Sequence, residues 1–341
     1  MNAYATIVRP LSVRETGRHE DAALKAFVEA TPGATPFHLP AWTRAVESGC
    51  AQRARFLIAE RGERIVGMLP LTEMRSALFG KALVSSAFAV GGGILGEGVE
   101  ELAAAARGFG YPSIELRGGP VPESWSVDEG QYLGFARLLA ADDEAELAAI
   151  PRKHRAEVRK ALANDLEVVV GGVELAREHF GIYAESTRNL GSPVFPSGMM
   201  RAALETMNSD VLTIRHQGRA VASVLSVYLG DTVYPYWGGG THAARGLRAN
   251  ERMYFALMSH ARARGCTRFD FGRSKVGTGP AAYKKNWGFT PEPLVYGSWS
   301  EGGKREVNPL NPKYALMVRT WKKLPLPLAM RLGPWISRGL G

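Results

Sequence analysis

The residues best suited to chemistry lie close together in the stretch 267–289, TRFDFGRSKVGTGPAAYKKNWGF. Its start alternates, with Phe269 and Phe271 on one face and Asp270 on the other, and this period of two predicts a half-buried strand. A glycine-rich loop, residues 277–280, is expected next, and four cations and two aromatic residues surround it: Arg273, Lys275, Lys284, Lys285, Tyr283 and Trp287. Cations in a loop at a strand end favour an anionic substrate, phosphate or carboxylate. The alternative is a solvated basic loop with Trp287 in the core.

Charge and composition narrow the class of protein. The chain has 341 residues, a formal net charge of +9 and 45% hydrophobic residues, which is typical of a globular protein with anionic partners. Its two cysteines, Cys50 and Cys266, have no metal or redox spacing, and no run approaches the ~18 apolar residues of a spanning helix. The N-terminus has no signal-peptide pattern, so we expect a soluble cytoplasmic protein without a bound metal or cofactor.

Motifs of several other enzyme classes are missing from the sequence. There is no Walker loop, no His-Glu-x-x-His and no Gly-x-Ser-x-Gly. Residues 91–96, GGGILG, match the letters of a dinucleotide fingerprint, but Glu97-Gly98 delay the helix that should begin at the last glycine. A nucleotide-dependent oxidoreductase or a hydrolase is therefore not indicated.

The order of predicted elements occurs twice in the chain. In the first copy we expect a hairpin of strands 54–60 and 64–71, a strand at 82–90, a glycine-rich bend at 91–93, a helix at 99–107 and a strand at 113–117. In the second copy the same elements are expected at 211–216 and 219–229, 232–237, 238–240, 251–264 and 267–271. Glu115 and Asp270 occupy equivalent places 155 residues apart, as do Gly110 and Gly265. We therefore predict an α/β (α+β) protein made of two tandem units, each a mixed, mostly antiparallel sheet flanked by helices.

Two further segments carry clustered cations. A helix is expected over residues 150–166, with Arg152, Arg155 and Arg159 on one side and Lys153 beside them. Like charges at this spacing repel unless an anion lies against them, although a solvated basic face is the alternative. The C-terminal tail, residues 321–341, mixes cations with Leu, Met and Trp, so it packs on the body of the protein or lies on an anionic bilayer.

The repeated unit resembles the GNAT acyltransferase fold, and two such units in one chain resemble the FemAB (Fem-type aminoacyl/peptidyl transferase) family. The motifs that carry the resemblance are TPFHLPAW at 35–42, RKHR at 152–155, DFGR at 270–273 and YKKNWG at 283–288. More narrowly, the chain is similar to FemAB-like proteins of exopolysaccharide and PEP-CTERM/exosortase systems. On this basis we expect a first unit at residues 1–145, a second at 146–300 with the active-site loop, and a C-terminal extension at 301–341.

The resemblance implies transfer of an aminoacyl or acyl group to an amine of a nucleotide- or lipid-linked saccharide in cell-wall (peptidoglycan) or exopolysaccharide biosynthesis. Lys284 matches the lysine of the family's Phe-Lys motif, near the acceptor's phosphates or the oxyanion, and Tyr283 stands where the family usually has Phe. The reaction also needs a proton acceptor, for which Asp270 and Glu115 at strand ends are candidates, although Asp270 could instead be a structural carboxylate that pairs with Arg273 or caps a loop. The substrate-binding candidates are Arg152, Lys153, Arg155, Arg159, Tyr236, Trp237, Asn250, Arg273, Lys285 and Trp287.

The identity of the donor stays open at the level of sequence. Aminoacyl-tRNA is the donor of the best-known family members, whereas acyl-CoA is the donor that the GNAT loop Gln/Arg-x-x-Gly-x-Gly/Ala binds. In the corresponding residues here, 243–250, Ala243 stands where the motif requires Gln or Arg, and Arg248 stands where it requires Gly or Ala. The motif is therefore broken. A non-catalytic scaffold that binds tRNA or polysaccharide is the third alternative, and loss of turnover on replacing Lys284 distinguishes an enzyme from it.

Overall fold

The computed structural model describes residues 10–77, 80–301 and 315–341 and contains two sheets. The first sheet has the order β1-β2-β3-β4-β6-β15-β7, with β5 paired to β3. Its strands are β1 (Leu11–Thr16), β2 (Arg53–Arg61), β3 (Arg64–Ser76), β4 (Gly80–Ser85), β5 (Leu95–Gly96), β6 (Ser113–Arg117), β7 (Ser126–Asp128) and β15 (Tyr296–Ser300). Its helices are α1 (Asp21–Ala30), α2 (Pro40–Cys50) and α3 (Val99–Arg107).

The second sheet has the order β14-β8-β13-β12-β11-β10-β9. Its strands are β8 (Tyr132–Leu138), β9 (Glu167–Gly171), β10 (Ser209–His216), β11 (Arg219–Leu229), β12 (Thr232–Gly240), β13 (Arg268–Lys275) and β14 (Pro291–Pro293). The accompanying helices are α4 (Asp143–Ala149), α5 (Arg152–Ala163), α6 (Ala176–Leu190), α7 (Ser197–Thr206), α8 (Ala244–Leu247), α9 (Ala249–Ala263) and α10 (Gly279–Asn286). Two more, α11 (Ala315–Trp321) and α12 (Leu326–Ser337), follow near the C-terminus.

The repeated order predicted from the sequence is confirmed. In each sheet one parallel pair, β4 with β6 and β12 with β13, joins strands that are otherwise antiparallel. One predicted strand, 82–90, is shorter than expected and ends at Ser85, because Ser86 and Phe88 have left-handed φ angles of 44° and 62° that break the ladder.

Each sheet contains one strand from the other half of the sequence. β8, within residues 1–145, pairs with β13 and β14 in the second sheet, and β15, within residues 146–300, pairs with β6 and β7 in the first. The sheets therefore do not divide at residue 145 as simply as the sequence ranges suggest.

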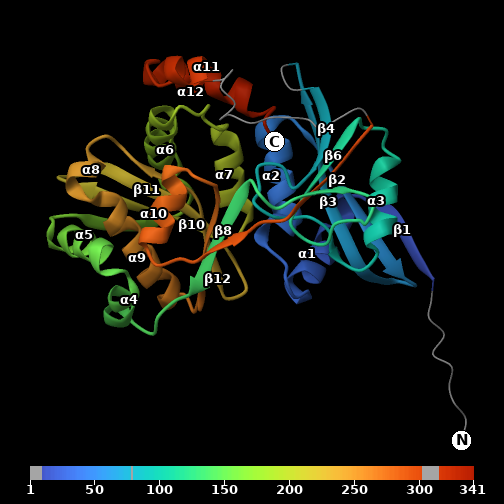
Figure 1. Ribbon diagram of the computed structural model, residues 1–341, viewed down its shortest axis with the longest axis horizontal. Coiled ribbons are helices and arrows are strands. Elements are labelled where there is room, and N and C mark those ends of the chain that lie inside the picture. Colours follow the sequence, from blue (N-terminus) through green and yellow to red (C-terminus); the bar gives the residue numbers. More distant parts are fainter. Residues whose placement is uncertain (1–9, 78–79, 302–314) are drawn as a thin grey trace, which may run out of the picture.

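The layers between the sheets form a single hydrophobic core. α1 and α2 cover one face of the first sheet, α6 and α7 cover one face of the second, and these four helices pack together in the centre (Figure 1). The TPFHLPAW motif lies in this layer: Trp42 stacks on Trp237 of β12 with ring centroids 5.3 Å apart, and Phe37 lies 4.9 Å from Tyr236. The indole N–H of Trp42 donates to the carbonyl of Ala87 at 3.2 Å. The motif thus joins the two units.

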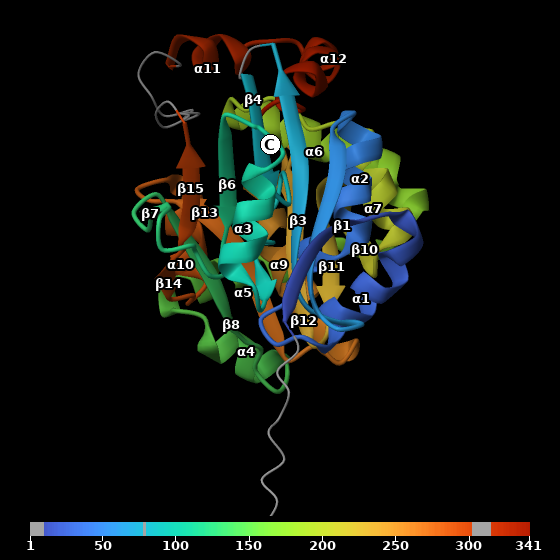
Figure 2. The same ribbon diagram turned by 90° about the vertical axis from the view of Figure 1, so that its right-hand side faces the viewer.

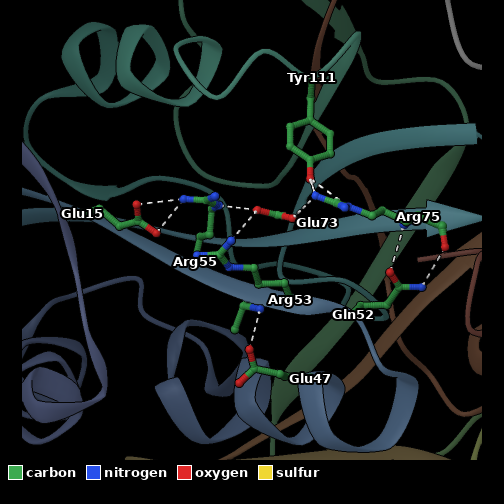
Figure 3. A network of polar contacts seen from close by, with 9 residues as sticks. Glu15, Glu47, Gln52, Arg53, Arg55, Glu73, Arg75 and Tyr111 are labelled. Carbon is green, nitrogen blue, oxygen red and sulfur yellow. Dashed lines mark hydrogen bonds and ion pairs between the residues drawn. The ribbon is translucent and has the colours of Figure 1, made fainter.

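A buried charge cluster, centred on Glu73, holds the end of β3 in the first unit (Figure 3). Glu73 is 1% exposed, and its carboxylate accepts hydrogen bonds from Arg55 and, at 2.8 Å, from Arg75. Burial alone would raise the pKa of Glu73, but hydrogen bonds with Tyr111 and Arg55 hold it below its ordinary value. Gln52 continues the network by bonding the backbone of Arg75 and donating to the carbonyl of Arg338 at 2.9 Å. The network therefore ties the C-terminal segment to the first unit.

The C-terminal helices lie across one end of the molecule, at the top of Figures 1 and 2. Ser337 donates to the carbonyl of Val194 at 2.8 Å, Arg188 donates to the carbonyl of Leu324 at 2.9 Å, and Arg117 donates to the carbonyl of Gly341 at 2.6 Å. Residues 315–341 therefore contact both units. The remainder of the predicted extension, residues 302–314, lies outside the described part of the chain.

Candidate active site

The Asp-Phe-Gly-Arg motif forms a β-bulge in β13. Asp270 lies opposite Ala136 and Arg273 opposite Gly134, so Phe271 and Gly272 together face the single residue Phe135 of β8. Gly272 has a φ of 67°, which favours glycine, and its N–H donates to the Asp270 carboxylate at 2.8 Å. A bulge re-aims the side chains that follow it. Here it turns Arg273 toward the first unit.

Replacing Gly272 with alanine is expected to cost about 1–2 kcal/mol of stability and to weaken substrate binding through Arg273. An added Cβ would meet only Val90, at 3.7 Å, so the cost is conformational rather than steric. Gly279→Ala is the matched control, because this nearby glycine has no neighbour within 4 Å of an added Cβ and no positive φ. Urea unfolding and KM measurements on both variants test this, and equal effects at the two positions would contradict a special role for the bulge.

Lys284 lies on α10, which begins at Gly279 inside the expected glycine-rich loop. Its ammonium donates to the carbonyl of Arg273 at 2.8 Å and lies 5.4 Å from the ring of Phe135 and 5.3 Å from that of Phe271. Burial lowers the pKa of Lys284 to about 7, against the opposing influence of Asp270. A lysine that titrates near neutral pH inside a buried site is typical of catalytic residues.

Asp270 is the acidic partner within this site. Burial raises its pKa, whereas the Gly272 N–H and the charge of Lys284 act in the opposite direction. The sequence showed no neighbourhood that would shift this carboxyl, because the burial comes from residues far apart along the chain. Glu115, the other carboxylate candidate, lies on β6 of the first sheet and forms an ion pair with Arg117 at 2.8 Å.

Arg273 lies where the two units meet. Its guanidinium donates to the Tyr296 hydroxyl at 2.7 Å and lies over the ring of Tyr132 at 4.6 Å. Within the described ranges it forms no ion pair with a carboxylate, so the pairing of Asp270 with Arg273 that the sequence allowed is not observed. Tyr296 in turn donates to the carbonyl of Val90 at 2.8 Å. Burial raises the pKa of Tyr236, and the positive charges of Arg273 and Arg117 oppose that rise. A cation held by π faces and a hydroxyl is suited to an anionic ligand.

The four aromatic candidates lie outside this cluster of charged side chains. Trp287 is 0% exposed and Trp237 is 3% exposed, so both are core residues, and the core alternative for Trp287 is the one that the structure supports. Tyr283 points into a separate aromatic cluster with His154, 5.7 Å away, and Tyr254, 6.1 Å away. Tyr236 bonds the carbonyl of Phe88, which fixes it at the junction of the units.

The cations of α5 divide into two groups. Arg155 donates to the carbonyls of Ile150 and Ala148 and so caps the preceding helix α4. Arg152, Lys153 and Arg159 are exposed, as is Lys285 on α10. Arg155 therefore has a structural role, whereas the four exposed cations are accessible to an anionic partner.

The turn between β12 and α9 departs from an ordinary phosphate loop. α8 is inserted there, and Arg248, in a left-handed conformation with φ 56°, bonds Glu157. The Asn250 Oδ1 and Thr241 Oγ1 atoms are buried without a hydrogen-bond partner among the described residues. β12 and β13 pair only at residues 232–233 and 268–269, so the strands diverge beyond this point. Diverging strands and polar atoms without a partner among the described residues make this turn a second candidate ligand site.

Metal-binding clusters and membrane-spanning helices are both absent from the described parts of the chain. No group of three His, Cys, Asp or Glu residues there could hold a metal ion. None of the helices in those parts is long and apolar enough to cross a membrane.

Comparisons with known proteins bear on the fold and on the class of enzyme. Residues 151–285 match the family model described as an acetyltransferase (GNAT) domain, a span that includes α5, the bulge and Lys284. A crystal structure of FemX superposes with a TM-score of 0.64 at 12% identity, covering 83% of this chain and 96% of FemX. The protein has a FemX-like tandem GNAT fold.

Two further structures share this tandem GNAT fold. The C-terminal domain of a putative lysylphosphatidylglycerol synthetase from Agrobacterium fabrum gives a TM-score of 0.54 at 14% identity, covering 83% of this chain and 92% of that domain. A tandem GNAT protein from the clavulanic acid biosynthesis pathway gives 0.51 at 13% identity, covering 86% of this chain and 100% of that one. No curated protein sequence matches the chain. The match to an acetyltransferase (GNAT) domain supports an acyltransferase, and Lys284, Asp270 and Arg273 lie within the matched residues 151–285.

Proposed function

We propose that this acyltransferase transfers an aminoacyl group from aminoacyl-tRNA to an amine of a nucleotide- or lipid-linked saccharide. The observation that carries the proposal is the placement of half-buried Lys284 and Asp270 beside Arg273, with the Lys284 ammonium bonded to the Arg273 carbonyl at 2.8 Å, in the matched GNAT span. Two cations and one carboxylate leave the site with a net positive charge. Such a site suits both an anionic acceptor and an oxyanion that develops during acyl transfer.

The proposed reaction uses each of these groups. The neutral acceptor amine attacks the ester carbonyl carbon, and the Lys284 ammonium donates a hydrogen bond to the resulting oxyanion. The Asp270 carboxylate, whose pKa is raised by burial, accepts the proton that the amine loses. The ester C–O bond then breaks, and the proton passes to the departing hydroxyl oxygen. Arg273 binds a phosphate or carboxylate of the acceptor at the junction of the two units.

Exposed cations beside the site support a polyanionic donor. Arg152, Lys153 and Lys285 are exposed, and α10 packs close to the start of α5, because a Cβ on Gly288 would lie 3.2 Å from Pro151. Phosphates of a tRNA acceptor stem would neutralise this surface. The net charge of +9 also favours a polyanionic donor.

An acyl-CoA-dependent N-acyltransferase is the second candidate. It is favoured by the match to the GNAT acetyltransferase domain and by the Asn250 Oδ1 and Thr241 Oγ1 atoms at the β12–α9 turn, which have no hydrogen-bond partner within the described ranges. Backbone amides at the start of a helix are suited to a pyrophosphate. The inserted α8 and the engagement of Arg248 with Glu157 argue against this donor.

Binding titrations of the purified protein against charged tRNA and acetyl-CoA, each at two salt concentrations, distinguish the two donors. We expect saturable binding of charged tRNA that weakens steeply with salt, and no binding of acetyl-CoA. The triple variant Arg152→Ala/Lys153→Ala/Lys285→Ala should have a shallower salt slope than a control with Lys25, Arg107 and Arg201 replaced by alanine. Saturable acetyl-CoA binding that releases free CoA with an amino-sugar acceptor would overturn the aminoacyl-tRNA proposal.

A further inference from the structure

The C-terminal helix α12 has two faces of different character. Ala329, Gly333 and Ser337 are buried against the body of the protein. On the other side, Leu328, Leu332 and Trp335 are 48%, 45% and 55% exposed and recur at helical spacing, so they form one outward stripe. This stripe is a continuous apolar surface on a helix that is already packed on its inner face.

The inner face of α12 is fixed in place. A Cβ on Gly333 would lie 2.6 Å from the backbone nitrogen of Val194, so the helix approaches this segment too closely for any other residue. Ser337 bonds the carbonyl of Val194, and Gln52 bonds the carbonyl of Arg338. The outward stripe therefore cannot turn inward without breaking these contacts.

Every charged side chain of this segment is positive. Residues 315–341 contain Arg319, Lys322, Lys323, Arg331 and Arg338 and no Asp or Glu, and all five cations are exposed. None of the five forms an ion pair with a carboxylate in the described part of the chain. Met317 of α11 adds a further exposed apolar side chain, at 60%.

We propose that α11 and α12 form a docking surface for an anionic lipid bilayer. Exposed Leu and Trp side chains enter the boundary between headgroups and acyl chains, and flanking Lys and Arg bind anionic headgroups. Both helices lie along one end of the molecule, so a planar surface reaches them together (Figures 1 and 2). A second copy of the chain is a poor occupant, because a symmetric contact would bring five cations against five without a neutralising carboxylate. The proposal is independent of the identity of the acyl donor.

Co-sedimentation of the full chain with vesicles tests this surface. We expect binding to vesicles of phosphatidylcholine with anionic phosphatidylglycerol, little binding to pure phosphatidylcholine, and release at high salt. Leu328→Ser/Leu332→Ser/Trp335→Ser should lower the partition coefficient about tenfold or more. The matched control replaces Val127, Leu138 and Val173, which are 52%, 67% and 44% exposed at other places, with serine.

Charge reversal gives an independent test. Lys322→Glu/Lys323→Glu/Arg331→Glu should lower partitioning about a hundredfold. Lys25→Glu/Arg107→Glu/Arg201→Glu has the same net charge and should retain most of the binding if the effect is local. Circular dichroism and thermal unfolding verify that each variant is folded. Equal loss in test and control variants, failure of the wild-type chain to bind anionic vesicles at low salt, or a lipid-free dimer that only the α12 variants dissociate would overturn the proposal.

Discussion

Replacing Lys284 with alanine is expected to lower kcat about 100- to 1000-fold while the protein stays folded. The side chain is half-buried, its ammonium donates to the carbonyl of Arg273 at 2.8 Å, and the charge of Asp270 acts to raise its pKa. Removing it deletes the donor to the oxyanion without deleting the aromatic packing around it. Steady-state kinetics with saturating donor and acceptor measure the effect.

The neighbouring lysine is the matched control for this experiment. Lys285 is exposed on the same helix, so Lys285→Ala should leave kcat nearly unchanged and affect only donor binding. If both variants retain the turnover of the wild type, the catalytic assignment of Lys284 is wrong. If both lose it equally, α10 acts through its packing and Lys284 has no special role.

The pH dependence follows from the same residue. The pKa of Lys284 is lowered to about 7, chiefly by burial, so the free enzyme loses the ammonium as the pH rises through about 7. Because the oxyanion needs the charged form, kcat/KM should decline on the alkaline side of this pKa. Lys284→Arg keeps the charge at all accessible pH values, and any residual activity should lack this decline. A profile that rises through pH 7 in the wild type and is lost in Lys284→Arg would instead make neutral Lys284 the base.

Trp42→Ala is expected to lower the free energy of unfolding by about 3–5 kcal/mol, the largest stability effect that we predict. Trp42 is 1% exposed and contacts Phe37, Tyr236 and Trp237, with centroid distances of 4.8, 4.9 and 5.3 Å. Its removal leaves a cavity between the two units and an unpaired carbonyl at Ala87. Urea denaturation followed by far-UV circular dichroism measures the change.

The control for this variant is another tryptophan on the surface. Trp335 is 55% exposed, so Trp335→Ala should change stability by no more than about 0.5 kcal/mol. Trp42→Phe keeps most of the ring stacking and should lie between the two. A loss in Trp42→Ala that does not exceed the loss in Trp335→Ala would show that the aromatic cluster does not hold the units together.

The sequence by itself determined the repeated architecture and the segment that carries the chemistry. Hairpins with turns at Gly62 and Gly218, and strands that follow helices ending near Gly110 and Gly265, are encoded by local turn chemistry and by hydrophobic periodicity. The alternation at Phe269 and Phe271 predicted β13, and the matched Lys284 lies beside it. These features depend on residues within a few positions of one another, which is why a pattern reveals them.

Only the tertiary structure decided which faces meet and which charges are buried. The exchange of β8 and β15 depends on pairing between strands more than 130 residues apart, and no local pattern specifies a pairing partner. Periodicity shows that Trp237, Trp287 and Leu332 lie on apolar faces. Only the packing of the elements places both tryptophans in the core and leaves Leu332 at the surface. Likewise, the pKa shifts of Asp270 and Lys284 arise from desolvation by both neighbouring strands and helix α10, a quantity that depends on the assembled fold rather than on sequence.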